Sequence, residues 1–135
     1  MLGSARLVAN LGSGDIDRTV EFYEGKLGLP LIERRELMPG RPEALFDANG
    51  AVICFEGGGP PKPGPNPLIV WEVDDIERTI AGLRDRGVEF EDYDLPGLKT
   101  EGGIASIAGL KASWFKDPDG NVLGLLENVR VATAS

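Results

Sequence analysis

The sequence has no histidine and one cysteine, Cys54, among its 135 residues. The absence of histidine removes the side chain that proteins use most often as a metal ligand and as a proton acceptor near neutral pH. One cysteine excludes a disulfide within the chain and is typical of a reducing compartment such as the cytoplasm. Both shortages exclude a thiol–imidazole catalytic pair and any metal site built on two histidines.

Positive charge and long apolar runs are also scarce. Lys and Arg number 14 against 22 Asp and Glu, which gives a net charge of −8. Phosphate backbones and anionic lipids need clustered basic residues, so we expect neither nucleic acid nor a membrane surface as a partner. The apolar stretches are far shorter than a membrane span, and residues 1–6 contain no apolar signal core. We therefore expect a cytoplasmic protein whose residues 1–135 form a single domain, since 41% of the residues are hydrophobic.

The sequence contains an internal repeat. The segment 15–20, Asp-Ile-Asp-Arg-Thr-Val, returns sixty positions later as 75–80, Asp-Ile-Glu-Arg-Thr-Ile. In each copy the aspartate is a suitable N-cap, apolar residues follow at helical spacing, and a glycine, Gly28 or Gly87, stands where the helix should end. The repeat predicts two copies of one supersecondary unit.

Strand-like segments surround each predicted helix. Segments 7–11 and 68–73 precede the helices, and further candidates follow at 31–36, 44–46, 51–56, 88–93, 110–116 and 121–127. Hairpin turns are expected at Asp47–Gly50 and Asp117–Gly120. Segment 57–67 is too rich in Gly and Pro for a helix or a central strand. The pattern predicts an α+β fold of two tandem βαβββ modules, 6–56 and 68–128, joined by a linker at 57–67.

The ordered set of these features, above all residues 15–29 and 114–127, resembles the vicinal oxygen chelate superfamily. This group contains glyoxalase I, extradiol dioxygenases and the fosfomycin and bleomycin resistance proteins. The resemblance implies two curled mixed sheets around a cleft, and often a homodimer. In members that use a metal, its ligands lie on the first and last strands of each module.

Placed on this sequence, the four implied ligand positions carry Val8, Cys54, Leu68 and Gly124. Three of these side chains have no lone pair to donate, and a lone thiol cannot replace three or four N and O ligands. Glu56 and Glu127 lie near the ends of the same strands, but both are displaced from the implied positions. We therefore predict no metal and no other cofactor.

Within the cleft that the resemblance implies, strand alternation predicts the residues of the lining. It directs toward the cleft Val8, Asn10, Val52, Cys54, Glu56, Leu68, Val70, Glu72, Val122, Gly124 and Leu126. A mostly apolar lining with a few polar groups is typical of small-molecule pockets. The predicted ligand-binding residues are Asn10, Cys54, Glu56, Val70, Glu72, Lys99, Trp114 and Leu126.

For each candidate, an interpretation without a role in ligand binding or catalysis stays open at this point. Asn10 either orients a ligand or bonds to backbone and water. Glu56 and Glu72 are either proton-accepting bases or solvated acids. Cys54 and Trp114 are candidates for packing as much as for binding. Segment 94–107, with Lys99, is expected to be a long loop, either a lid or without a role.

Three functions are consistent with the sequence. The first is a protein that binds a small, largely apolar molecule without a metal. The second is a metal-independent isomerase or lyase for a small carbonyl compound, with Glu56 or Glu72 as the base. The third, a divalent-metal lyase or dioxygenase, rests on the resemblance alone, and function depends on sites rather than folds.

Overall fold

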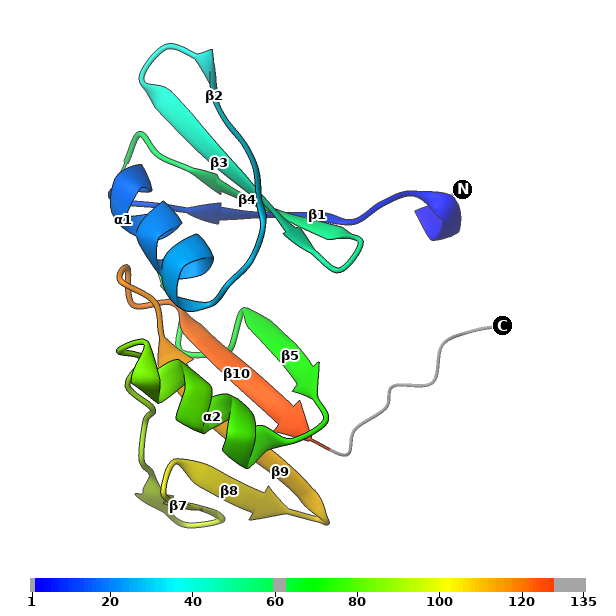
Figure 1. Ribbon diagram of the computed structural model, residues 1–135, viewed down its shortest axis with the longest axis vertical. Helices are drawn as coiled ribbons and strands as arrows, with labels where there is room; N and C mark the ends of the chain where they lie inside the picture. Colours follow the sequence, from blue (N-terminus) through cyan, green and yellow to red (C-terminus); the bar gives the residue numbers. More distant parts are fainter. Residues whose placement is uncertain (1, 60–62, 128–135) are drawn as a thin grey trace. The chain divides into compact units, whose positions relative to one another are not determined.

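The computed structural model describes residues 2–59 and 63–127, which belong to two compact units, Met1–Lys62 and Pro63–Ser135 (Figure 1). Each unit combines one mixed β-sheet with a helix, so the α+β class is confirmed. The repeat is confirmed as well, because each unit contains a first strand that is followed by an aspartate-capped helix. The boundary between the units lies inside segment 57–67; the limits of the two predicted modules stay a prediction.

The first unit begins with η1 (Leu2–Ser4), β1 (Val8–Gly12), α1 (Ile16–Val20) and a π-helical turn, η2 (Glu21–Lys26). Three antiparallel strands follow. These strands are β2 (Leu31–Met38), β3 (Arg41–Ala48) and β4 (Ala51–Glu56), and the sheet order is β1-β4-β3-β2. β1 runs parallel to β4, so the sheet is mixed.

The start and the end of the first helix follow from single residues. The side chain of Asp15 accepts a hydrogen bond from the Arg18 backbone N–H at 3.2 Å and caps the N-terminus of α1. Gly28 closes the helical segment with a φ of 77°, a left-handed conformation that glycine adopts at little cost.

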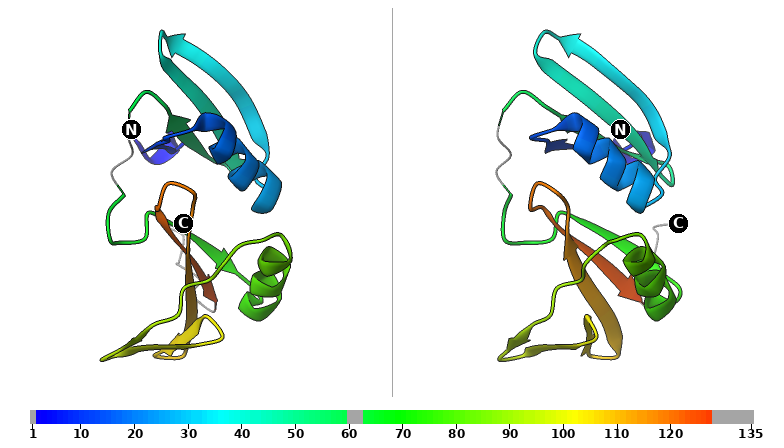
Figure 2. Two further views of the ribbon diagram at one scale, coloured as in Figure 1. Left: turned by 90° about the vertical axis from the view of Figure 1, so that its left-hand side faces the viewer. Right: turned by 60° about the vertical axis from the view of Figure 1, so that its left-hand side comes forward.

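The core of the first unit lies between α1–η2 and one face of the sheet. The fully buried rings of Tyr23, Phe46 and Phe55 meet there, with the centroids of Tyr23 and Phe55 4.4 Å apart. Because side chains alternate along a strand, the residues next to Phe55 and Phe46 point to the opposite face. The helix lies on one side of this sheet (Figure 2). The face away from the helix carries the pocket described below.

The second unit begins with β5 (Ile69–Val73) and α2 (Ile76–Asp85), which is capped by Asp75. It continues with β6 (Asp94–Leu95), β7 (Leu98–Glu101), β8 (Ile104–Ile107), β9 (Leu110–Lys116) and β10 (Val122–Glu127). The sheet order is β5-β10-β9-β8-β7-β6, with β5 parallel to β10. Its core is built around Phe115, which stacks on Trp71 and contacts Phe90.

Two expectations for the second unit are wrong. Residues 88–93 form no strand: they meet β9 only at the bridge between Phe90 and Phe115 and at the hydrogen bond from Glu91 N–H to the Trp114 carbonyl, while β8 pairs with the other part of β9, residues 110–112. Segment 94–107 is not a long loop; it holds β6, β7 and β8. Its glycines form the turns between these strands, and Gly97, Gly102 and Gly103 all have positive φ.

Within the residues that the structure describes, no helix has the length and apolar character that crossing a membrane requires.

Candidate functional site

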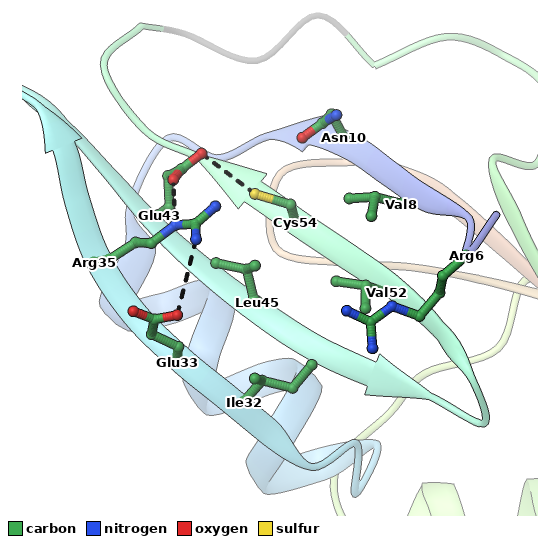
Figure 3. A pocket seen from close by; sticks show the side chains of 10 residues that line it. All are labelled: Arg6, Val8, Asn10, Ile32, Glu33, Arg35, Glu43, Leu45, Val52 and Cys54. Carbon is green, nitrogen blue, oxygen red and sulfur yellow. Dashed lines mark hydrogen bonds and ion pairs between the residues drawn. The ribbon is translucent and has the colours of Figure 1, made fainter.

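A pocket of about 480 Å³ lies on the face of the first sheet that points away from α1 (Figure 3). All four strands contribute side chains to it, and the residue Arg6 adds one from just before β1. Its lining consists of Arg6, Val8, Asn10, Ile32, Glu33, Arg35, Glu43, Leu45, Val52 and Cys54. The volume falls in the range of roughly 300–1,000 Å³ that is usual for small-molecule sites.

The floor of the pocket comes from the parallel pair β1 and β4. Their register places Val8 opposite Val52 and Asn10 opposite Cys54. Val52 and Cys54 are buried, whereas 47% of Val8 is exposed. Strand alternation had predicted that these four side chains share a face, and the pocket brings them together.

The wall of the pocket comes from β2 and β3, where Arg35 lies opposite Glu43. The Arg35 Nε donates to Glu43 Oε1 at 2.9 Å, and the more distant Glu33 carboxylate lies 3.9 Å from an Arg35 nitrogen. The other oxygen of Glu43 accepts from the Cys54 thiol at 3.5 Å. One guanidinium, one carboxylate and one thiol thus form a chain of contacts along one end of the pocket.

The contacts among Arg35, Glu43 and Cys54 shift the pKa values of all three side chains. The hydrogen bond from Arg35 lowers the pKa of Glu43, and the same bond raises the pKa of Arg35. Burial, followed by the hydrogen bond to Glu43, raises the pKa of Cys54 from 9.0 to about 11. At neutral pH Glu43 is therefore ionised and Cys54 is a neutral thiol, which is a poor nucleophile and a poor metal ligand.

We expect Cys54 to be unreactive in the folded protein. A thiol with a pKa of about 11 has roughly a hundredfold less thiolate at pH 8 than one with a pKa of 9.0. Labelling with Ellman's reagent at pH 8 should therefore be at least about a hundredfold slower in buffer than in urea. The raised pKa stabilises the fold below pH 9, and this contribution is lost as the pH rises from 9 to about 11. Equal labelling rates with and without urea would contradict the assignment.

The pocket does not include the carboxylates that the sequence offered as bases. Glu56 lies at the end of β4, where Arg41 pairs with its Oε1 at 2.7 Å. Glu72 lies exposed on β5 of the second unit, opposite Leu126. Neither lines a pocket that we find among the described residues. Their proposed role as a catalytic base stays a prediction.

The remaining predicted site residues lie in the second unit. Val70 and Trp114 both flank Gly124: a carbon added at Gly124 would lie 3.5 Å from Val70 Cγ2 and 3.7 Å from Trp114 Cδ1. Trp114 also meets Tyr93 edge to face at 5.6 Å. Lys99 lines a separate hollow of about 390 Å³ beside α2, together with Glu77, Glu101, Ile104, Ser106 and Lys111. Whether any of them binds a ligand stays a prediction.

The prediction from the sequence contains four of the ten pocket residues and lacks the other six. Arg35 and Glu43 lie on β2 and β3, outside the first and last strands to which the resemblance assigns metal ligands. The alternation of Glu43 and Leu45 with the buried Ala44 and Phe46 was a usable signal. Alternation could not predict that both Ile32 and Glu33 line the pocket. A bulge in β2 directs these two neighbouring side chains to the same face.

Comparison with known proteins identifies the family. A family model described as glyoxalase/bleomycin resistance protein/dioxygenase superfamily matches residues 6–125. The chain belongs to this superfamily. A search among curated proteins gave no match.

Solved structures share the fold of this chain. A superfamily member from Sphaerobacter thermophilus is 26% identical, with 95% of this chain and 100% of that chain covered and a TM-score of 0.71. TnmS3, an antibiotic binding protein from a Streptomyces, is 22% identical, with coverages of 94% and 98% and a TM-score of 0.65. FosX from Listeria monocytogenes, a fosfomycin resistance protein complexed with Mn(II) and sulfate, is 16% identical, with coverages of 96% and 95% and a TM-score of 0.68.

The residues of this superfamily member do not fit a metal at the four implied positions. Val8 and Leu68 have no donor atoms, and the thiol of Cys54 is held protonated beside Glu43. Gly124 has no side chain to act as a ligand, and a carbon added there would meet the Ser113 backbone oxygen at 3.4 Å and the side chains of Val70 and Trp114. Among the described residues, no three His, Cys, Asp or Glu side chains gather as a ligand set.

Glu127, the second displaced carboxylate, has a structural role instead. It lies on the helix side of β10, and its Oε2 accepts a hydrogen bond from the Ile76 backbone N–H at 2.7 Å. A carboxylate at this end of α2 satisfies a free N–H group and complements the helix dipole. This contact explains why an acid stands at the end of β10.

Proposed function

We propose that this protein binds a small, largely apolar molecule in the pocket of the first unit, without the help of a metal. The observation that carries the proposal is the state of Cys54. At the position implied for a metal ligand, this side chain is a neutral thiol bonded to Glu43, which is itself held by Arg35. The polar end of the pocket is thus organised by its own hydrogen bonds.

The composition of the pocket supports an apolar ligand. Four aliphatic side chains form its middle, Val8, Ile32, Leu45 and Val52, between polar groups at its two ends (Figure 3). The side-chain amide of Asn10 has no hydrogen-bond partner among the described residues, so it is available to donate to and accept from a ligand. The description of TnmS3 as an antibiotic binding protein is consistent with a binding function on this fold.

Thermal melting of tag-free protein tests the proposal. We expect Mn²⁺, Ni²⁺, Zn²⁺ and EDTA to leave the melting temperature unchanged to within about 1 °C, because the described residues form no suitable ligand set. The apolar dye N-phenylnaphthylamine, added at about a hundred times its Kd, should raise the melting temperature by roughly 5 °C or more.

Two outcomes would contradict the proposal. A divalent metal that raises the melting temperature by several degrees, with EDTA reversing the rise, would favour the metal-dependent functions of the superfamily. Absence of binding across a panel of apolar dyes would argue against the pocket. The dye titration is best followed by fluorescence as well, since a dye bound only to unfolded chains lowers the melting temperature instead.

Two further expectations accompany this function. The resemblance implies a homodimer, which light scattering coupled to size exclusion would test. A cytoplasmic location, inferred from the single cysteine, remains part of the proposal.

A further inference from the structure

The polar groups of the pocket differ in whether their charge is already neutralised. Arg35 lies between Glu43 and Glu33, at 2.9 Å and 3.9 Å, so its charge is compensated within the pocket. Both oxygens of Glu43 are occupied, one by Arg35 and one by the Cys54 thiol. The charged groups at this end of the pocket are therefore already paired with one another.

Arg6 is the exception. It lines the pocket next to Val52, at the end opposite Glu43, and its guanidinium points over the aliphatic floor (Figure 3). Among the described residues it has neither an ion pair nor a hydrogen-bond partner. A guanidinium offers five N–H donors in a planar fork that matches a carboxylate or a related oxyanion. A ligand that supplies such a group would satisfy them.

We infer that the occupant of the pocket is an amphipathic organic anion. Its acidic oxygens pair with Arg6, its apolar body covers Val8, Val52 and Leu45, and a neutral polar group at its far end meets Asn10. This inference rests on the proposed binding function and adds the charge of the ligand to it.

The net negative charge of the protein disfavours the binding of anions, but it does not exclude an anionic ligand. A charge of −8 repels them at long range, but at physiological salt the screening length is only about 8 Å. Direct contact with the unpaired guanidinium acts within that distance. Charge-assisted hydrogen bonds are about twice as strong as neutral ones. We therefore expect recognition to depend on Arg6 itself rather than on the field of the whole molecule.

Two dyes with one skeleton test the inference. Anilinonaphthalene sulfonate carries an anionic group, and N-phenylnaphthylamine has the same apolar body without it. In fluorescence titrations at 0.15 M salt, Arg6→Gln should weaken binding of the sulfonate by about tenfold and binding of the neutral dye by less than about twofold. Arg6→Lys should restore part of the loss, because it keeps the charge without the fork.

The control is Arg86→Gln, which removes the same charge from an exposed position in the second unit. It should leave both affinities unchanged. Equal effects of Arg6→Gln on the two dyes, or binding of the neutral dye alone, would overturn the inference while the apolar binding function stands. Failure of both dyes to bind would remove the proposed function itself.

Discussion

Replacing Val8 with tryptophan is expected to weaken binding of N-phenylnaphthylamine by at least about thirtyfold, which corresponds to roughly 2 kcal/mol. Val8 lies opposite Val52 on the pocket floor, and nearly half of it (47%) is exposed. A side chain that is half exposed accepts a larger ring without overpacking the core. The indole would then occupy the space above Val52 and Leu45 that the ligand needs. Fluorescence titration of the purified variant measures the loss.

The matched control for this variant is Leu37→Trp. Leu37 lies on β2 of the same sheet, is 69% exposed and does not line the pocket. It adds the same indole to the surface, so any nonspecific effect of the ring on dye fluorescence appears in both proteins. Both variants should melt within about 2 °C of the wild type, because neither changes a buried side chain. Unchanged dye affinity in Val8→Trp would show that the ligand binds elsewhere.

The ends of the two helices were predictable from the sequence because short-range rules control them. Asp15 and Asp75 each cap a helix through a bond to the backbone three residues later. Gly28 and Gly87 end the helical segments with positive φ. Such features depend on four or five neighbouring residues, and they recur in the second copy for the same reason.

The strands of the second unit were harder to predict, because the length of a strand depends on how far its partner continues beside it. Residues 88–93 have the apolar alternation of a strand, yet they bridge β9 only at Phe115, and β8 pairs with β9 at residues 110–112. Phe90 contributes its ring to the core near Phe115 instead. Pairing between distant segments is decided by tertiary packing, which a local pattern does not contain.

Four of the ten pocket residues were predictable, and the rest were not for a related reason. The parallel pair β1 and β4 follows strict alternation, so Asn10 and Cys54 were expected on one face. The ion pair between Arg35 and Glu43 depends instead on the register of β2 against β3, and a bulge at Ile32 changes that register. One extra residue in a strand alters which side chains meet.

Replacing Phe55 with alanine is expected to lower the free energy of unfolding by about 3–5 kcal/mol. Phe55 is fully buried, and its ring contacts Tyr23 and Phe46 between the sheet and α1. Removal of the ring leaves a cavity that two rigid aromatic neighbours fill poorly. A loss of this size is a large part of the roughly 5–15 kcal/mol that stabilises a typical domain. Urea unfolding followed by circular dichroism measures it.

Two milder variants separate the cavity from other effects of the substitution. Phe55→Leu keeps most of the volume and should lose clearly less than the alanine variant. Leu37→Ala removes an exposed side chain and should change stability by less than about 0.5 kcal/mol. Because Phe55 directly follows Cys54 on β4, a shift of this strand also moves the pocket floor. The alanine variant should therefore bind N-phenylnaphthylamine more weakly even where it is still folded. A loss of stability below about 1 kcal/mol would show that this ring is not enclosed by the aromatic cluster.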